Sequence, residues 1–142
     1  MRAIDIHDEI NPRVAIAPAA AYTTNSAIVS AIIDRSGFES LEFVIETGAI
    51  TAGASFAVSI SDGNQSNLSD GAVVVAPFLL GTFALAGFTA AANANSCLKI
   101  GYAGVNRYVQ LTITPTGNTS AFIAATAVLG GPHSAPTANP PV

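Results

Sequence analysis

Three segments of this chain alternate apolar and polar residues with a period of two, and no other feature constrains the fold as strongly. The segments are residues 38–47, 55–61 and 107–114. Successive side chains of a β-strand point to opposite faces, so each segment is expected to bury one face and expose the other. The residues predicted to point into the core are Leu41, Phe43, Ile45, Phe56, Val58, Ile60, Val109, Leu111 and Ile113.

Further short apolar runs alternate with segments rich in Gly, Asn, Asp and Ser, which favour turns. Strands are expected within residues 27–33, 72–76, 98–102 and 120–129, with a further candidate strand at 78–88 and a loop or short helix at 90–96. Roughly seven or eight short strands joined by such turns are typical of an antiparallel β-sandwich. The sequence therefore predicts an all-β fold.

The sandwich is expected to span residues 26–131, with an extended arm before it and a tail after it. Residues 1–25 form the predicted N-terminal arm, in which Pro12 and Pro18 oppose a long regular element. The predicted tail, residues 132–142, holds four prolines and is expected to be extended. Three acidic residues among the first ten oppose a secretory signal peptide.

Residue types that carry chemistry are scarce in this chain. Its 142 residues include two histidines, one cysteine and no tryptophan, and only 10% are charged whereas 50% are hydrophobic. His7, Cys97 and His133 lie far apart in the sequence, without the ligand spacing of a metal site. We therefore expect no enzymatic activity, no catalytic residues, and no metal or cofactor.

Two sets of acidic residues, a loop and a pair of glutamates, could have either a functional or a structural role. The loop at residues 62–70 is rich in oxygen ligands, but it lacks the glycine and the glutamate of an EF-hand, so cation binding there stays open. Glu42 and Glu46 share one strand face at a separation of about 13 Å. That separation is too large for a pair of hydrolytic carboxylates, so both side chains are expected to face solvent.

Nucleic-acid binding and membrane insertion are both disfavoured. The five basic residues are scattered and the net charge is −4, so no basic stripe matches a phosphate backbone. Tyr102, Arg107 and Tyr108 form a small aromatic and basic group that suits either stacking on a base or sugar or packing at a strand interface. Residues 71–98 carry no charge, but Pro77 interrupts them, and strands and loops are expected there rather than a membrane span.

The low charge also predicts assembly. A monomer of this size usually carries more Lys, Glu, Asp and Arg on its surface. The uncharged region at residues 72–96 is therefore expected to be covered by a partner. Each Å² of apolar area buried there would contribute about 25 cal/mol.

Several short motifs resemble a group of small proteins of tailed bacteriophages and prophages that are encoded among the head genes. The motifs are DRSGFESLEF at residues 34–43, LGT at 80–82, KIGY at 99–102, NRYVQLTI at 106–113 and AVLGGPH at 127–133. The resemblance covers roughly residues 26–136. One departure is that this chain lacks the acidic and basic residues that the relatives carry in the region of residues 84–95.

This resemblance implies a capsid decoration or cement protein with a jelly-roll-like sandwich. Such a protein would form a homotrimer, bind the major capsid protein and lie on the outer capsid surface of a virion that is assembled in the host cytoplasm. The arm would then be the capsid anchor, because it offers apolar side chains to insert. The expected capsid-contact residues are Ile4, Ile6, Ile10 and Val14.

Two other roles within a virion stay open. One is a binding module, in a head fibre or tail tip, that recognises a cell-surface glycan. The other is a head-completion or tail component.

Overall fold

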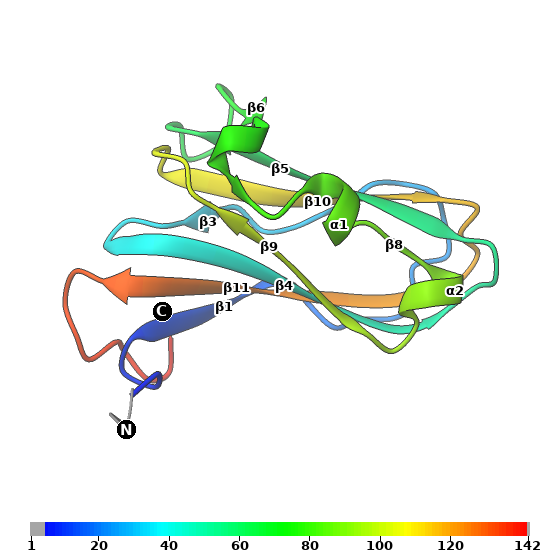
Figure 1. Cartoon of the computed structure of the whole chain (residues 1–142), viewed down its shortest axis with the longest axis horizontal. Helices are drawn as coiled ribbons and strands as arrows, with labels where there is room; N and C mark the ends of the chain where they lie inside the picture. The colour runs from blue at the N-terminus through cyan, green and yellow to red at the C-terminus, as the bar shows by residue number, and fades with distance from the viewer. Residues whose placement is uncertain (1–4, 142) are drawn as a thin grey trace.

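Two antiparallel β-sheets pack face to face in the computed structural model, which describes residues 5–141 (Figure 1). The first sheet has the order β1 (Ile10–Ile16), β11 (Ala121–Pro132), β4 (Phe38–Ile50), β9 (Cys97–Tyr102) and β7 (Leu79–Leu80). The second has the order β2 (Ile28–Val29), β10 (Tyr108–Thr116), β5 (Ser55–Gly63) and β6 (Ala72–Val73). In addition, β3 (Ile33–Asp34) pairs with β10, and β8 (Phe88–Thr89) pairs with β5. The predicted all-β sandwich is confirmed.

The core lies between the sheets and includes the residues that the alternation selected. All nine predicted core residues are buried, with exposed fractions between 0% and 4%. Phe56 also stacks on Phe88 of the neighbouring strand, with ring centroids 4.6 Å apart. The period of two therefore identified the buried face correctly in β4, β5 and β10.

The first strand of the sandwich begins at Ile10, within the segment that was expected to be a free arm. Strand β1 pairs with β11 from Ile10 opposite Gly130 to Ile16 opposite Ala125. Ile16 is buried, and Pro12 is tolerated because β1 is the edge strand of its sheet. The expected boundary at residues 25 and 26 is thus corrected, because this segment covers the edge of β11 rather than extending away from it.

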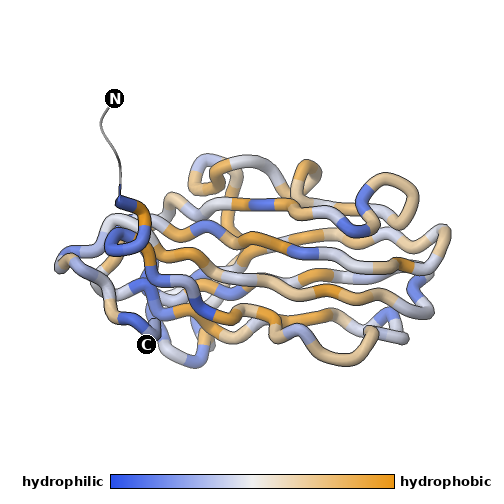
Figure 2. Tube along the Cα trace, turned by 90° about the horizontal axis from the view of Figure 1, so that it is seen from below, coloured by the Kyte–Doolittle hydropathy of each residue, from blue (hydrophilic) through white to orange (hydrophobic). Residues whose placement is uncertain are grey.

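The C-terminal segment beyond β11 lies against the residues that precede β1. The Thr137 amide donates a hydrogen bond to the carbonyl of Asp8 at 3.0 Å, and its hydroxyl donates to the carbonyl of Ile10 at 2.7 Å. Hydrophilic residues are concentrated at the end of the sandwich that carries both termini (Figure 2). The two segments predicted to be independent extensions therefore contact one another.

Residues 72–96 cross between the sheets instead of forming two longer strands. The elements in this region are β6, η1 (Ala76–Phe78), β7, α1 (Phe83–Ala86), β8 and α2 (Ala90–Asn93). Pro77 lies in the first turn of η1, and the Thr82 hydroxyl caps α1 by accepting a hydrogen bond from the Leu85 amide at 3.1 Å. These local signals break the expected strand at residues 78–88. Among the described residues, no helix has the length and apolar character of a membrane span.

Candidate interaction surfaces

One lateral edge of the sandwich lies on the side opposite β1 (Figure 1). This edge carries exposed apolar side chains. Strand β6 extends the second sheet and β7 extends the first, so the chain between them closes the gap between the sheets. Among residues 5–141, half of the exposed large apolar side chains lie here, with exposed fractions from 45% to 76%. We call these residues the apolar edge: Val73, Val75, Phe78, Leu80 and Leu85.

The segment that carries the apolar edge both completes the core and presents apolar side chains to solvent. Its inward-facing neighbours Val74, Ala86 and Phe88 are buried and complete the core. Its outward side chains have no charged residue among them, since residues 71–98 are uncharged. An exposed apolar surface of this kind is typical of a contact with another protein.

The expected capsid-contact residues occupy three different environments. Ile6 and Val14 are exposed, and Val14 is on the outer face of β1. Ile10 is half-buried at the start of β1, beneath the contact with Thr137. Ile4 lies outside the described residues. Two of the four side chains are thus available at the surface next to β1.

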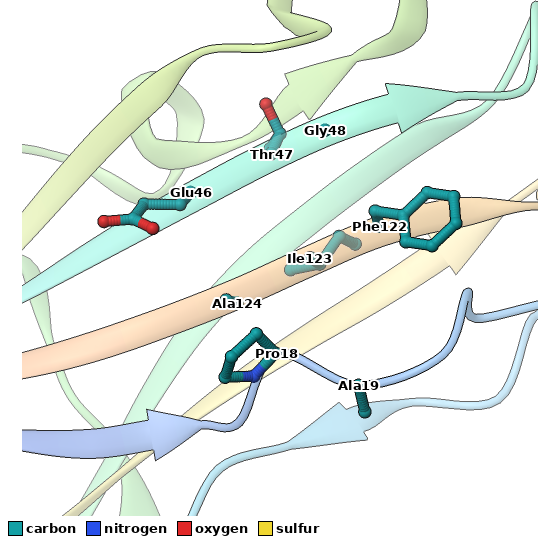
Figure 3. Close-up of a pocket in the computed structure, with 8 residues that line it drawn as sticks. All are labelled: Pro18, Ala19, Glu46, Thr47, Gly48, Phe122, Ile123 and Ala124. Carbon is teal, nitrogen blue, oxygen red and sulfur yellow. The ribbon is translucent and has the colours of Figure 1, made fainter.

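A groove lies on the outer face of the first sheet, beyond the point where β1 ends (Figure 3). Its volume is about 230 Å³. The residues that line it are Pro18, Ala19, Glu46, Thr47, Gly48, Phe122, Ile123 and Ala124. We call it the β4–β11 groove.

Two outward side chains and two small residues shape this groove. Phe122 is 48% exposed, and Glu46 is exposed and makes no ion pair among residues 5–141. Between them lie Ala124, which pairs with Glu46, and Gly48, where a Cβ would come within 3.0 Å of the Phe122 Cβ. In Figure 3 the Glu46 carboxylate and the Phe122 ring lie at opposite ends of the group. The groove therefore offers an aromatic ring and a carboxylate across a floor of small residues.

Thr47 lines the same groove but its hydroxyl serves another contact. It hydrogen-bonds to the carbonyls of Asn93, the last residue of α2, and of Ser96 in the loop that follows. Figure 3 shows this side chain turned away from Pro18. Its role is to hold the loop against β4.

The aromatic and basic group predicted from the sequence is divided by the structure. Tyr102 is buried and donates a hydrogen bond to the Asp62 carboxylate, so its ring is not a stacking surface. Arg107 lies over the Tyr108 ring at 5.1 Å and forms a bidentate pair with Asp34 at 2.7 and 2.8 Å. This pair holds the pKa of the Asp34 carboxyl below its usual range. Of the two interpretations offered by the sequence, these residues fit packing at a strand interface rather than stacking on a base or sugar.

Asp62 and Asp70, the carboxylates of the acidic loop, are engaged in hydrogen bonds within the protein. Asp70 accepts hydrogen bonds from the amides of Asn64 at 2.8 Å and Gln65 at 3.1 Å, which lower the pKa of its carboxyl. Asp62 is engaged by Tyr102. Within residues 5–141, no group of three or more His, Cys, Asp or Glu side chains is arranged to hold a metal ion.

The other residues singled out from the sequence remain separate. Glu42 and Glu46 lie on the outer face of β4, as predicted, and burial raises the pKa of the Glu42 carboxyl. His133 pairs with Glu39, and Cys97 is exposed at the start of β9. These contacts assemble no reactive group.

Apart from Glu46, the groove residues were not identified as a site from the sequence, although one signal was present. In residues 121–129 the inward positions hold Ala, Ile or Leu, and these are buried. Phe122 falls out of phase with them, so the alternation itself places a large aromatic ring on the outer face. No local pattern predicts that Gly48 and Pro18 line the groove. Their neighbours depend on the register between β4 and β11 and on the course of the chain after β1.

Comparison of the sequence with protein-family profiles and with curated proteins gives no match. Among solved structures, the chain is similar to the SPBc2 prophage-derived protein YomS, with 13% identity, a TM-score of 0.49, and coverage of 92% of this chain and 100% of YomS. It is also similar to a chain of infectious bursal disease virus, Gx strain, with 12% identity, a TM-score of 0.49, and coverage of 84% and 31%. A third similarity is to the xylan-binding module CBM15, with 11% identity, a TM-score of 0.35, and coverage of 92% and 96%. Such low values assign no function to this chain.

Proposed function

We propose that this protein is a structural component of a tailed-phage virion, where it decorates the outer surface of the capsid and stabilises the shell. The motifs within residues 26–136 that resemble phage head proteins support this class. The observation that carries the proposal is the apolar edge, five exposed apolar side chains within an uncharged segment that is expected to contact a partner.

Self-association through the apolar edge explains its composition. Burial of apolar area favours association, and the apolar-edge side chains themselves carry no charge that would add to the repulsion between copies whose net charge is −4. The strands at this edge, β6 and β7, have only two residues each. They offer little backbone for strand addition, so side chains make the contact. We propose a homotrimer held in part by this edge.

The shell contact is assigned to the opposite edge, where Ile6 and Val14 are exposed beside β1. The partner proposed there is the major capsid protein. A trimer presents this surface three times, so weak single contacts add up to firm binding on a repeating lattice. Binding to the assembled shell alone stabilises that shell by mass action.

The oligomeric state tests the role of the apolar edge. Light scattering during gel filtration should give a mass of three chains of 14.3 kDa for the wild-type protein. Leu85→Glu and Val75→Glu should reduce the mass to one chain, because each places a charge in the contact. The matched control is Val105→Glu, which alters a side chain that is 87% exposed at the β9–β10 turn and should leave the trimer intact. A monomeric wild-type protein would contradict the proposed trimer.

Purified virions test the decoration role itself. Quantitative mass spectrometry should find this chain in numbers comparable to the major capsid protein, and shells that carry it should withstand higher temperature than shells without it. A copy number that matches a neck or tail ring would favour the head-completion alternative. A few copies per virion would favour a receptor-binding module.

A further inference from the structure

We propose that the β4–β11 groove binds one ring of a neutral saccharide. This binding site is additional to the proposed shell and trimer contacts, and it lies on a different part of the surface. Four properties of the groove support the inference: an exposed aromatic ring, a free carboxylate, an unpaired stretch of strand edge, and a volume that suits a single sugar ring.

Phe122 supplies the apolar wall. Nearly half of its side chain is exposed, although the alternate residues of β11, such as Ile123, are buried in the core. The base of this side chain lies against Gly48 of β4, where an added Cβ would be only 3.0 Å from the Phe122 Cβ. An exposed aromatic ring of this kind can pack against the C–H face of a pyranose.

Glu46 supplies a hydrogen-bond acceptor on the far side of the same floor. Its carboxylate is exposed and unpaired among residues 5–141, so both oxygens are available to sugar hydroxyls. Charge-assisted hydrogen bonds of this kind are about twice as strong as neutral ones. The groove is lined by no basic residue, so the ligand it favours is neutral rather than anionic.

The edge of β11 supplies backbone groups between these two side chains. Strand β1 ends with Ile16 opposite Ala125, and the next pairing on that edge joins Tyr22 to Ala121. The amide and carbonyl of Ala121 both point to this edge, since each bonds to Tyr22. Because backbone groups alternate in direction along a strand, those of Ile123 point the same way. They face the side on which Pro18 and Ala19 pass without pairing to β11.

The size of the groove restricts the ligand to a single ring. At about 230 Å³ it is smaller than the sites of about 300–1,000 Å³ that hold drug-sized ligands. Its open shape allows the rest of a glycan chain to extend into solvent. We therefore expect weak affinity for a monosaccharide, with a Kd in the millimolar range, and a gain from several copies on one particle.

Titration of the ¹⁵N-labelled protein with methyl glycosides tests the site. Methyl β-D-glucopyranoside, methyl β-D-galactopyranoside and methyl α-D-mannopyranoside are the neutral probes, and N-acetylneuraminic acid is the anionic comparison. At least one neutral glycoside should shift the amide resonances of Gly48, Ile123 and Ala124. N-acetylneuraminic acid should shift them less, because Glu46 repels its carboxylate.

Variants separate the site from nonspecific effects. Phe122→Ala should weaken binding about tenfold through the loss of stacking, and Glu46→Gln about fivefold through the loss of charge. Val105→Ala is the control for the apolar side chain, since Val105 is 87% exposed and belongs neither to the groove lining nor to the apolar edge, and Glu39→Gln is the control for the carboxylate. Both controls should bind like the wild-type protein. Absence of shifts with all three neutral glycosides, or a Kd in Phe122→Ala equal to that of the wild-type protein, would overturn the proposal.

Discussion

Tyr102 of β9 donates a hydrogen bond to the carboxylate of Asp62 in β5, and this bond joins the two sheets of the sandwich. The phenol oxygen also accepts a hydrogen bond from the Asn106 amide at 3.0 Å. One buried side chain thus links both sheets to the turn between β9 and β10. It is a polar contact at the border of an otherwise apolar core.

Replacing Tyr102 with Phe should lower the free energy of unfolding by about 1–3 kcal/mol, because Asp62 loses a buried partner. Urea denaturation measures this change. The matched control is Tyr108→Phe, whose hydroxyl is in a half-buried residue under Arg107 and should matter little. If the two substitutions lower the free energy of unfolding equally, the hydrogen bond between the sheets makes no specific contribution to stability.

The same hydroxyl predicts a loss of stability at high pH. Burial, together with the hydrogen bond to Asp62, raises the pKa of Tyr102 above its usual value of 10.0. Above about pH 10 the unfolded chain therefore releases a proton that the folded protein retains, and the free energy of unfolding falls as the pH rises. Urea midpoints measured between about pH 9 and pH 11 should decline less in Tyr102→Phe than in the wild-type protein. An identical decline would assign the effect to other groups.

Replacing Asp70 with Ala should loosen the loop after β5. Its carboxylate accepts two backbone hydrogen bonds, so the amides of Asn64 and Gln65 should exchange with solvent faster in the variant. Asn67→Ala is a control in the same loop, since Asn67 bonds only the Ser69 amide there. Hydrogen exchange followed by NMR distinguishes the two variants. Unchanged protection of both amides would mean that the loop does not depend on Asp70.

The core substitution that tests the sandwich most directly is Phe43→Ala. Phe43 is fully buried in the central strand of the first sheet, so its loss should cost about 3–5 kcal/mol. Phe122→Ala removes the same side chain from the outer face of the neighbouring strand and should cost far less. Chemical denaturation compares the two, and similar costs would contradict the assignment of inner and outer faces.

The buried face of the sandwich was predictable because it depends on local alternation. Phe43 and Leu111 are separated by many residues, yet each is placed in the core by its own strand's period of two. The interruption of the expected strand at residues 78–88 was harder to predict from the sequence. Pro77 and the Thr82 cap are visible in the sequence, but an uncharged stretch that must cross between sheets has no periodicity to mark it.

The role of β1 and the groove depend on contacts between distant segments. Nothing near Ile10 in the sequence shows that it pairs with Gly130, because the pairing partner lies at the other end of the chain. The position of Gly48 beside Phe122 likewise follows from the register of β4 against β11. Registers between distant strands, unlike faces within one strand, are not encoded in a local pattern.

Truncation from the N-terminus tests the revised role of the first strand and the shell contact together. Deleting residues 1–9 removes Ile6 and leaves β1 in place, so the sandwich should remain folded and should bind shells less well. Deleting residues 1–16 also removes the strand that covers β11, including the buried Ile16, so the urea midpoint should fall sharply and the uncovered edge should promote aggregation. Circular dichroism, urea denaturation and shell co-sedimentation measure these outcomes. Equal stability of the longer deletion and the full chain would show that β1 is dispensable for the fold, and undiminished shell binding by the shorter deletion would place the anchor outside residues 1–9.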